Sequence, residues 1–422
     1  MAKDRATASP QACSFRHTGH MVPAGTAAHA VLFLSWLLAL GWIWQALTSL
    51  PGLARLPDLA RGGAGLPPLP PGDGPHITVI VPARNEEAAI ENTLRSLLAS
   101  TAVRLQIIAV DDRSTDRTGE RMEAIAVEAV TLGFTHSLKV LHVRELPAGW
   151  IGKPHAMALA AQQAAAPWIL FTDGDVLFHP NALELALRQA LTTRADHLVL
   201  VPSLILKSTG ERALVAAMQV LAQWTVRLWK VADPRARDFI GVGGFNLIRR
   251  EVYTQLGGFE SLRMEVLDDL RLGWRVKRGG FAQRVAIGAG LARIRWINGP
   301  LAVVRLAEKN GFAIYRFRVG VTLLAASGIA LQAVWPLAAM AAGGWSLIAG
   351  LVAYLGIAMV YVANRRVTQV SPWMAVFFAP AAALVTFAFV RSMVLALLRN
   401  GVDWRGTRYS LDELRRNVGS GW

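Results

Sequence analysis

Three long apolar stretches without a charged residue most constrain what this chain can fold into. They cover residues 30–50, 319–364 and 367–390. A helix that spans a bilayer needs roughly 20 apolar residues, so the first stretch is long enough for one span and the second for two. Buried helices of a soluble protein could account for one such stretch but hardly for all three. The sequence therefore predicts a membrane protein. Its first stretch is predicted to be a retained anchor, because it is too long for a signal peptide and no small-residue cleavage site follows.

The excess of basic residues narrows the possible partners. The chain has 44 Lys and Arg against 29 Asp and Glu, a net charge of +15. The Arg residues occur throughout the chain, with clusters at the edges of the apolar stretches, as at 365–366 and 391–399. This distribution favours contact with an anionic membrane surface, and no nucleic-acid partner is expected. Cys13 is the one cysteine, which excludes an internal disulfide and a cysteine-based zinc site.

The apolar stretches divide the chain into blocks. We expect a disordered N-terminus (1–28), a transmembrane anchor (29–50), a linker rich in Pro and Gly (51–75), a globular block (76–318), a C-terminal transmembrane region (319–398) and a basic tail (399–422). The linker is expected to let the globular block stand off the first helix. The C-terminal region is expected to hold two spans plus a third or re-entrant segment. Three spans would place the tail across the bilayer from the globular block. A re-entrant hairpin around Pro380 would keep both on one side, as the positive-inside tendency prefers.

The globular block opens with strands and helices in alternation. Residues 77–81, 105–110, 138–143 and 168–171 have the composition of strands, and helical stretches lie between them. This order predicts the α/β class, with a doubly wound and mostly parallel sheet. In such sheets ligands bind at the carboxyl ends of the strands.

Acidic motifs follow three of these strands. They are the segment from Pro82 to Glu86, the pair Asp111 and Asp112, and Asp173 with Asp175. One such motif is commonly a helix cap or a turn, but three at one edge of a sheet indicate a binding site. Two carboxylates spaced as Asp-x-Asp can hold a divalent cation, Mg²⁺ or Mn²⁺, together with substrate phosphates. Such a cation would neutralise a departing diphosphate.

Further candidates lie later in the globular block. Asp268 and Asp269 precede a helical stretch, where they are either charged helix caps or a general base that takes a proton from an acceptor hydroxyl. Lys153 is either an exposed surface residue or a contact to a phosphate. Gly243 and Gly244 either form turns or let the backbone approach a ligand closely.

In this order, the motifs resemble those of family-2 glycosyltransferases, which have an A-type nucleotide-sugar fold. The matching segments are VPARNE, VDDRSTD, GK ahead of FTDGD, GVGGFNLIRR with a following GGF, and LDDLRLGWRVKRGG. The resemblance implies that Asp173 and Asp175 hold the metal and that Asp269 is the catalytic base, with Asp268 beside it. The residues expected at the nucleotide-sugar donor are Pro82, Arg84, Glu86, Asp111, Asp112, Lys153, Asp173, Gly243 and Gly244.

The resemblance also implies the reaction and its location. We expect an inverting transfer to a lipid acceptor by a multi-pass protein of the bacterial inner membrane. Its catalytic block should be cytoplasmic, because nucleotide sugars are cytosolic. The motif VVRLAEKNGFAIYRFRVG and the tail DWRGTRYSLDEL resemble bacterial glycosyltransferases that modify lipids, including some associated with hopanoid genes. Residues 213–231 and 301–318 are expected to lie in the bilayer interface.

Other functions remain open from the sequence. A processive polysaccharide synthase carries Gln or Arg three residues before an Arg-Trp pair; here Arg295 and Trp296 are present, but Ala292 stands in the leading position. A polyprenyl-phosphate acceptor is already an anionic nucleophile and needs no base, so Asp269 favours a hydroxylated lipid. A non-catalytic binding protein should have lost a metal carboxylate or the base, and none is missing.

Overall fold

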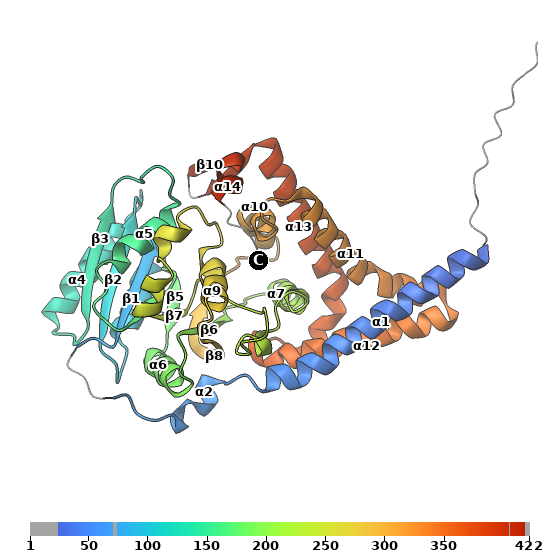
Figure 1. Cartoon of the computed structure of the whole chain (residues 1–422), viewed down its shortest axis with the longest axis horizontal. Coiled ribbons are helices and arrows are strands. Elements are labelled where there is room, and N and C mark those ends of the chain that lie inside the picture. The colour runs from blue at the N-terminus through green and yellow to red at the C-terminus, as the bar shows by residue number, and fades with distance from the viewer. Residues whose placement is uncertain (1–23, 71–73, 405, 418–422) are drawn as a thin grey trace, which may run out of the picture.

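The computed structural model describes residues 24–70, 74–404 and 406–417, which form an α/β domain with long helices projecting from one side (Figure 1). Most of the expected disordered N-terminus, residues 1–23, lies outside the described residues.

The domain is built around one mixed sheet. Its strand order within the described residues is β3-β2-β1-β4-β7-β6-β8-β5. The pairs β1–β2, β2–β3, β1–β4 and β6–β8 are parallel, which confirms the predicted mostly parallel sheet. The short strands β5 and β7 run antiparallel to their neighbours, which the sequence did not indicate. The bounds are β1 (Ile77–Ala83), β2 (Leu105–Asp112), β3 (Ser137–Val143), β4 (Trp168–Phe171), β5 (Val176–Phe178), β6 (His197–Leu204), β7 (Asn246–Arg249) and β8 (Gln283–Ile294).

Helices cover both faces of this sheet. Successive side chains of a strand point to opposite faces, so Val79 of β1 enters the core on one face and Ile80 the core on the other. Both residues are fully buried, which is typical of a central parallel strand. The helices of the domain are α3 (Ile90–Leu98), α4 (Thr118–Thr131), α5 (Gly152–Ala161), α6 (Ala182–Thr192), α7 (Thr209–Ala222), α8 (Arg250–Gln255) and α9 (Asp268–Arg278), with 3-10 turns η2 (Leu228–Lys230) and η3 (Phe259–Leu262).

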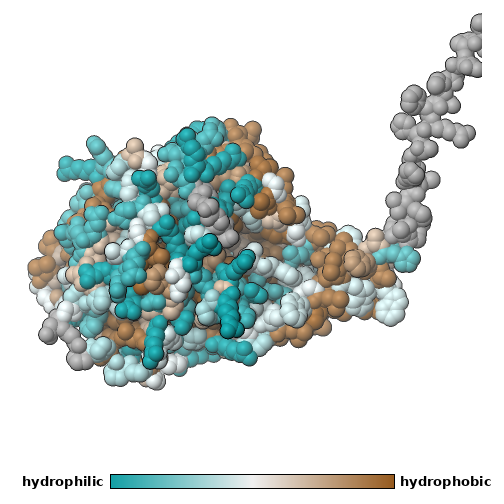
Figure 2. Space-filling model, in the orientation of Figure 1, coloured by the Kyte–Doolittle hydropathy of each residue, from teal (hydrophilic) through white to brown (hydrophobic). Residues whose placement is uncertain are grey.

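Four helical segments among the described residues are long and apolar enough to cross a membrane: α1 (Ala24–Ala54), α11 (Val319–Ala342), α12 (Gly344–Thr368), and η4 (Pro372–Phe377) continuing into α13 (Phe378–Leu398). In Figure 1, α1, α11 and α12 extend away from the domain, whereas α13 crosses near the base of α11 and α12. Their outer surface is apolar, and the domain surface is largely hydrophilic (Figure 2). Phe33 and Trp44 of α1, for example, are 71% and 67% exposed.

Buried polar side chains join the projecting helices to the domain. The Gln223 side chain, just after α7, accepts a hydrogen bond from the Ser49 hydroxyl of α1 at 2.9 Å and donates one to Asn364 of α12. All three side chains are buried. Buried polar groups are costly unless they are hydrogen-bonded, so this set fixes how α1 and α12 dock on the domain.

The segment expected to be a free linker packs on the domain instead. After α1, the short helix α2 (Leu59–Gly62) and the turn η1 (Gly63–Gly65) run along the sheet edge. The backbone N–H of Ile287 donates to the Pro57 carbonyl at 2.8 Å, and the Arg188 guanidinium donates to the carbonyl of Pro67 at 2.7 Å. Leu59 is buried. The expectation that the described part of this segment stands off is therefore not met, because apolar Leu residues between the Pro and Gly find partners in the domain.

The C-terminal part returns to the domain. Helix α10 (Ala302–Ile314) packs against α13. Beyond α13, the strands β9 (Gly401–Trp404) and β10 (Thr407–Ser410) form a hairpin that the helix α14 (Leu411–Asn417) follows. The stretches expected in the bilayer interface correspond mainly to α7 and α10, and both contact α13.

Candidate active site

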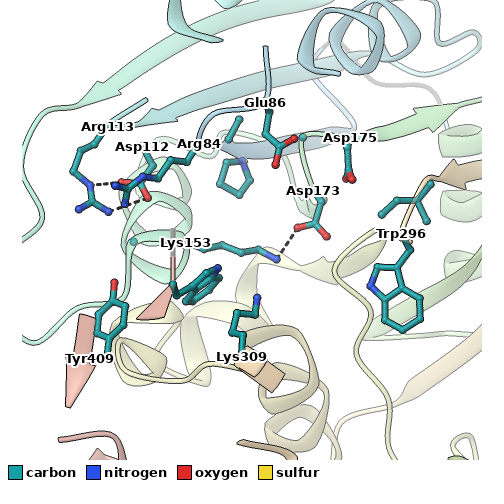
Figure 3. Close-up of a pocket in the computed structure, with 16 residues that line it drawn as sticks. Arg84, Glu86, Asp112, Arg113, Lys153, Asp173, Asp175, Trp296, Lys309 and Tyr409 are labelled. Carbon is teal, nitrogen blue, oxygen red and sulfur yellow. Dashed lines mark hydrogen bonds and ion pairs between the residues drawn. The ribbon is translucent and has the colours of Figure 1, made fainter. Parts of the chain in front are cut away.

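A cavity opens at the carboxyl ends of β1, β2 and β4, as the sheet topology predicts (Figure 3). Six of the expected donor residues line it, together with the expected metal ligand Asp175. The lining residues are Pro82, Ala83, Arg84, Glu86, Asp112, Arg113, Gly152, Lys153, Asp173, Gly174, Asp175, Ile294, Trp296, Lys309, Trp404 and Tyr409.

The two aspartates at the end of β2 separate. Asp112 is buried and lines the cavity, where the Arg113 guanidinium donates to its carboxylate at 2.8 Å. Asp111 points to the other face of the sheet because neighbouring residues of a strand alternate. There it contacts a ring nitrogen of His142 at 3.0 Å and accepts a hydrogen bond from the backbone N–H of Ser114. Asp111 is thus an expected donor residue that the structure places outside the cavity.

Lys153 connects the two acidic motifs that the sequence singled out. It lies in the first turn of α5, and its ammonium nitrogen is 2.6 Å from Asp173 and 3.6 Å from Asp268. Burial alone would lower the pKa of Lys153, but the charges of Asp173, Asp268 and Asp269 outweigh burial and raise that pKa. Lys153 is therefore a charged residue inside the site. Its position rules out the alternative of an exposed surface lysine.

Asp175 faces other carboxylates in the cavity. Partial burial, with the negative charges of Asp173 and Glu86, raises the pKa of the Asp175 carboxyl to about 7. A divalent cation would relieve this repulsion, and carboxylate oxygens are the ligands that Mg²⁺ and Mn²⁺ prefer. Within the described residues, no group of three or more His, Cys, Asp or Glu converges as a metal site. The residues present fit a cation that Asp173 and Asp175 hold together with substrate phosphates.

Asp268 and Asp269 form the first turn of α9. Asp268 is 4% exposed, and burial raises its pKa although Lys153 opposes the shift. Burial, with the charge of Asp268, raises the pKa of Asp269 to about 6, and the backbone N–H of Leu270 donates to its carboxylate at 2.7 Å. A carboxylate with a raised pKa is a stronger base than an exposed one. Neither residue is among those that line the cavity.

The glycine-rich loop before β7 supports the acidic residues without lining the cavity. A Cβ atom on Gly243 would lie 2.4 Å from a carboxylate oxygen of Asp173, and one on Gly241 would lie 1.8 Å from the carbonyl oxygen of Asp269. Gly244 accepts a hydrogen bond from the Thr172 hydroxyl at 2.8 Å through its carbonyl. Gly243 and Gly244 thus contact the strand-end motif, Gly243 beside Asp173 and Gly244 through Thr172, and neither lines the cavity.

Three cavity residues lie far from the motifs in sequence and were not expected there. They are Lys309 of α10, Trp404 of β9 and Tyr409 of β10. The Lys309 ammonium lies 3.9 Å from the centre of the Trp404 ring. The chain offers no local signal for these positions, because they belong to segments that read as an interfacial helix and a basic tail.

Part of the chain is similar to known glycosyltransferases. The sequence model of the family described as Glycosyl transferase family 2 matches residues 78–257. The chain is also 24% identical over 198 residues to the 4,4'-diaponeurosporenoate glycosyltransferase of Staphylococcus aureus strain USA300. That alignment covers 47% of this chain and 50% of the relative, so the chain spans about half the length of the curated relatives it matches.

Comparison with solved structures gives the fold. A mannosyltransferase from Pyrobaculum calidifontis, solved in complex with GDP-Man and Mn²⁺, superposes with a TM-score of 0.51 at 19% identity. The superposition covers 89% of this chain and 99% of that one. At this identity the likeness shows the fold alone, and it confirms the A-type fold expected from the sequence.

Proposed function

Because residues 78–257 match the model of glycosyltransferase family 2, we propose that the chain transfers a sugar from a nucleotide-sugar donor to a membrane lipid with inversion at the anomeric carbon. The observation that carries this proposal is the Lys153 ammonium, which contacts Asp173 of the strand-end motif and Asp268 of the α9 motif. It brings the residues proposed to hold the donor within reach of the residues proposed to activate the acceptor.

Four charged residues have separate roles in the proposed reaction. Asp173 and Asp175 would hold a divalent cation, which when bound neutralises charge on the leaving diphosphate. Lys153 adds a positive charge beside the same phosphates. Asp269 accepts the proton of the acceptor hydroxyl while that oxygen attacks the anomeric carbon. A single displacement of this kind inverts the configuration, so an α-linked donor gives a β-linked product.

Several features support a lipid acceptor. The domain is joined to helices that are long and apolar enough to cross a membrane. The name of the Staphylococcus aureus relative refers to diaponeurosporenoate, which favours a lipid-like acceptor. The base at Asp269 favours a hydroxyl group, because a phosphate acceptor would need no proton removed.

We place the catalytic domain and the C-terminal hairpin on the same, cytoplasmic side of the inner membrane. Helix α12 returns to the domain, because the Arg366 guanidinium donates to the Ala54 carbonyl at the end of α1 at 2.7 Å. Segment η4 packs against α12, and α13 leads into the hairpin that lines the cavity. Both ends of α13 therefore lie on the domain side, so α1, α11 and α12 cross the bilayer and α13 does not.

Product analysis tests this proposal directly. Membranes that contain the protein are incubated with a panel of radiolabelled nucleotide sugars, and the extracted lipids are separated and analysed by NMR. A β-linked glycolipid from an α-linked donor is expected. A label on polyprenyl phosphate, a long polysaccharide, or an α-linked product would contradict the proposed acceptor or mechanism.

A further inference from the structure

The hairpin of β9 and β10 is part of the cavity wall. Its residues Trp404 and Tyr409 line the same cavity as Lys153 and Asp173, and Figure 3 shows Tyr409 there. The guanidinium of Arg84, which also lines the cavity, is 3.5 Å from the Thr407 hydroxyl. The hairpin therefore contacts the first acidic motif, although 323 positions separate Arg84 from Thr407.

Tyr409 holds the turn that carries Lys153. Its side chain is 6% exposed and packs in the same buried cluster as Ile151, which directly precedes this turn. Burial raises the pKa of Tyr409, and a hydrogen bond from the Gly152 backbone opposes that shift. Gly152 also lies directly against Asp112, because a Cβ atom there would be 2.3 Å from a carboxylate oxygen of Asp112. The turn at Gly152 and Lys153 therefore packs between the end of β2 and the hairpin.

Trp404 holds a second lysine in the cavity. The Lys309 ammonium lies 3.9 Å from the centre of the Trp404 ring. An aromatic face attracts a cation, so the Trp404 ring helps to fix the position of the Lys309 ammonium in the cavity lining. The charge of Lys309 extends to the base motif, since it opposes the rise in the pKa of Asp268. Lys309 therefore places a fixed positive charge beside the proposed metal and base residues.

The hairpin is anchored by buried apolar side chains. Val402, Leu411 and Leu414 share a core cluster with Ile151, which precedes the Lys153 turn, and with Met264, which precedes α9. The guanidinium of Arg415 donates to the Phe317 carbonyl at 3.1 Å. These contacts make the hairpin a fixed wall that touches both the lysine turn and the loop before the base.

Building on the proposed function, we propose that this hairpin is a permanent part of the donor site. Tyr409 is a positioning residue for Lys153, and Trp404 holds Lys309 against the diphosphate of the bound nucleotide. The ligand that this part of the site binds is a nucleoside diphosphate.

Binding of free nucleotides separates a phosphate contact from a general loss of structure. The full-length protein is reconstituted in nanodiscs with Mn²⁺, and the affinities for UDP, GDP, uridine and guanosine are measured. Lys309→Met should weaken binding of the preferred nucleoside diphosphate by about tenfold or more, since a charge-assisted contact is lost, and leave nucleoside binding unchanged. Trp404→Leu should act in the same direction. Lys139→Met, an exposed lysine of β3, is the control with the same charge change.

A double-mutant cycle tests the role of Tyr409. Tyr409→Phe keeps the buried ring and removes the hydroxyl, so diphosphate affinity should fall about three- to tenfold. If Tyr409 acts through Lys153, the double variant with Lys153→Met should bind no more weakly than Lys153→Met alone. Additive losses would overturn the positioning role. Tyr354→Phe in α12 is the matched control.

The outcomes distinguish this inference from the proposed function. A wild-type protein that binds no nucleoside diphosphate and transfers no sugar would contradict the proposed function. If the wild-type protein binds a nucleoside diphosphate, and the Lys309→Met and Lys139→Met variants bind it equally tightly, only the hairpin proposal is overturned. Equal loss of nucleoside and diphosphate binding would also overturn it, because the effect would then be structural.

Discussion

At the residue scale, the site is a balance of opposite charges in a partly buried space. Asp268 is buried beside Lys153, and Asp175 faces Asp173 and Glu86. Each carboxylate without a nearby cation would be costly to ionise there. The charge of Lys153 favours the ionised forms of Asp268 and Asp269, and the strand-end carboxylates are suited to a divalent cation.

Removing the base should separate catalysis from donor binding. Asp269→Asn is expected to lower kcat by about 10²–10⁴, the usual contribution of general base catalysis. Nucleotide affinity should stay close to that of the wild type, because the cavity residues are unchanged. Turnover and nucleotide binding are measured on the same preparation. An Asp269→Asn protein with normal turnover would exclude Asp269 as the base.

The rate should depend on pH through the same residue. Because the pKa of Asp269 is raised to about 6, the carboxylate is protonated below that pH and can no longer accept a proton. At saturating Mn²⁺ and donor, kcat should therefore fall as the pH falls through about 6 and level off above it. A bound cation keeps Asp175 ionised, so its raised pKa should appear only in Mn²⁺ affinity. A kcat that is flat from pH 5 to 8 would contradict this assignment.

At the scale of elements, the loop before β7 sets the position of the strand-end motif. Gly243 leaves no space for a side chain next to Asp173, and Gly241 leaves none next to the backbone of Asp269. One loop therefore packs against both Asp173 and Asp269.

Neighbouring glycines of this loop should respond differently to the same change. Gly243→Ala places a methyl group 2.4 Å from an Asp173 oxygen and should displace that carboxylate, with at least a tenfold loss of Mn²⁺-dependent nucleotide binding. Gly244→Ala meets Pro202 only at an ordinary 3.5 Å and should be much milder. Isothermal titration of both variants compares them. Equal losses of nucleotide binding in the two variants would show that the loop does not determine the position of the Asp173 carboxylate.

At the scale of the whole molecule, the return of the hairpin to the site constrains the topology. A hairpin that touches the cavity cannot lie across a bilayer from the domain. If the helices between them cross a membrane as proposed, they must cross an even number of times, as α11 and α12 would. Helix α13 packs against α7, α10 and α11 near the domain and exposes apolar side chains such as Phe387.

Cysteine labelling can establish this arrangement. In a Cys13→Ser background, Ala342→Cys at the end of α11 should react with an impermeant maleimide in intact spheroplasts. Ser371→Cys before η4 and Ser410→Cys at the end of β10 should react only in inverted vesicles. Labelling of Ser410→Cys from outside would contradict the shared side of hairpin and domain.

The sequence by itself determined the features that depend on neighbouring residues. Strand periodicity and the acids at strand ends predicted the sheet, its binding edge, and the placement of Asp112, Asp173 and Asp175 in one cavity. Uncharged apolar runs identified α1, α11 and α12 as helices able to cross a membrane. These signals are local. The alternation of side chains along a strand and the apolarity of a helix are both determined by the residues of that strand or helix.

Only the tertiary structure decided which distant segments meet. It decided which of Asp111 and Asp112 faces the cavity, and it brought Lys309 and Tyr409 into the lining. Apolarity shows that α13 avoids water, but not whether it crosses a bilayer, which depends on where its two ends are anchored. The hairpin that follows α13 packs against Ile151, which anchors the C-terminal end of α13 to the domain. The sequence of the hairpin and the sequence around Ile151 do not, each by itself, predict that the two pack together.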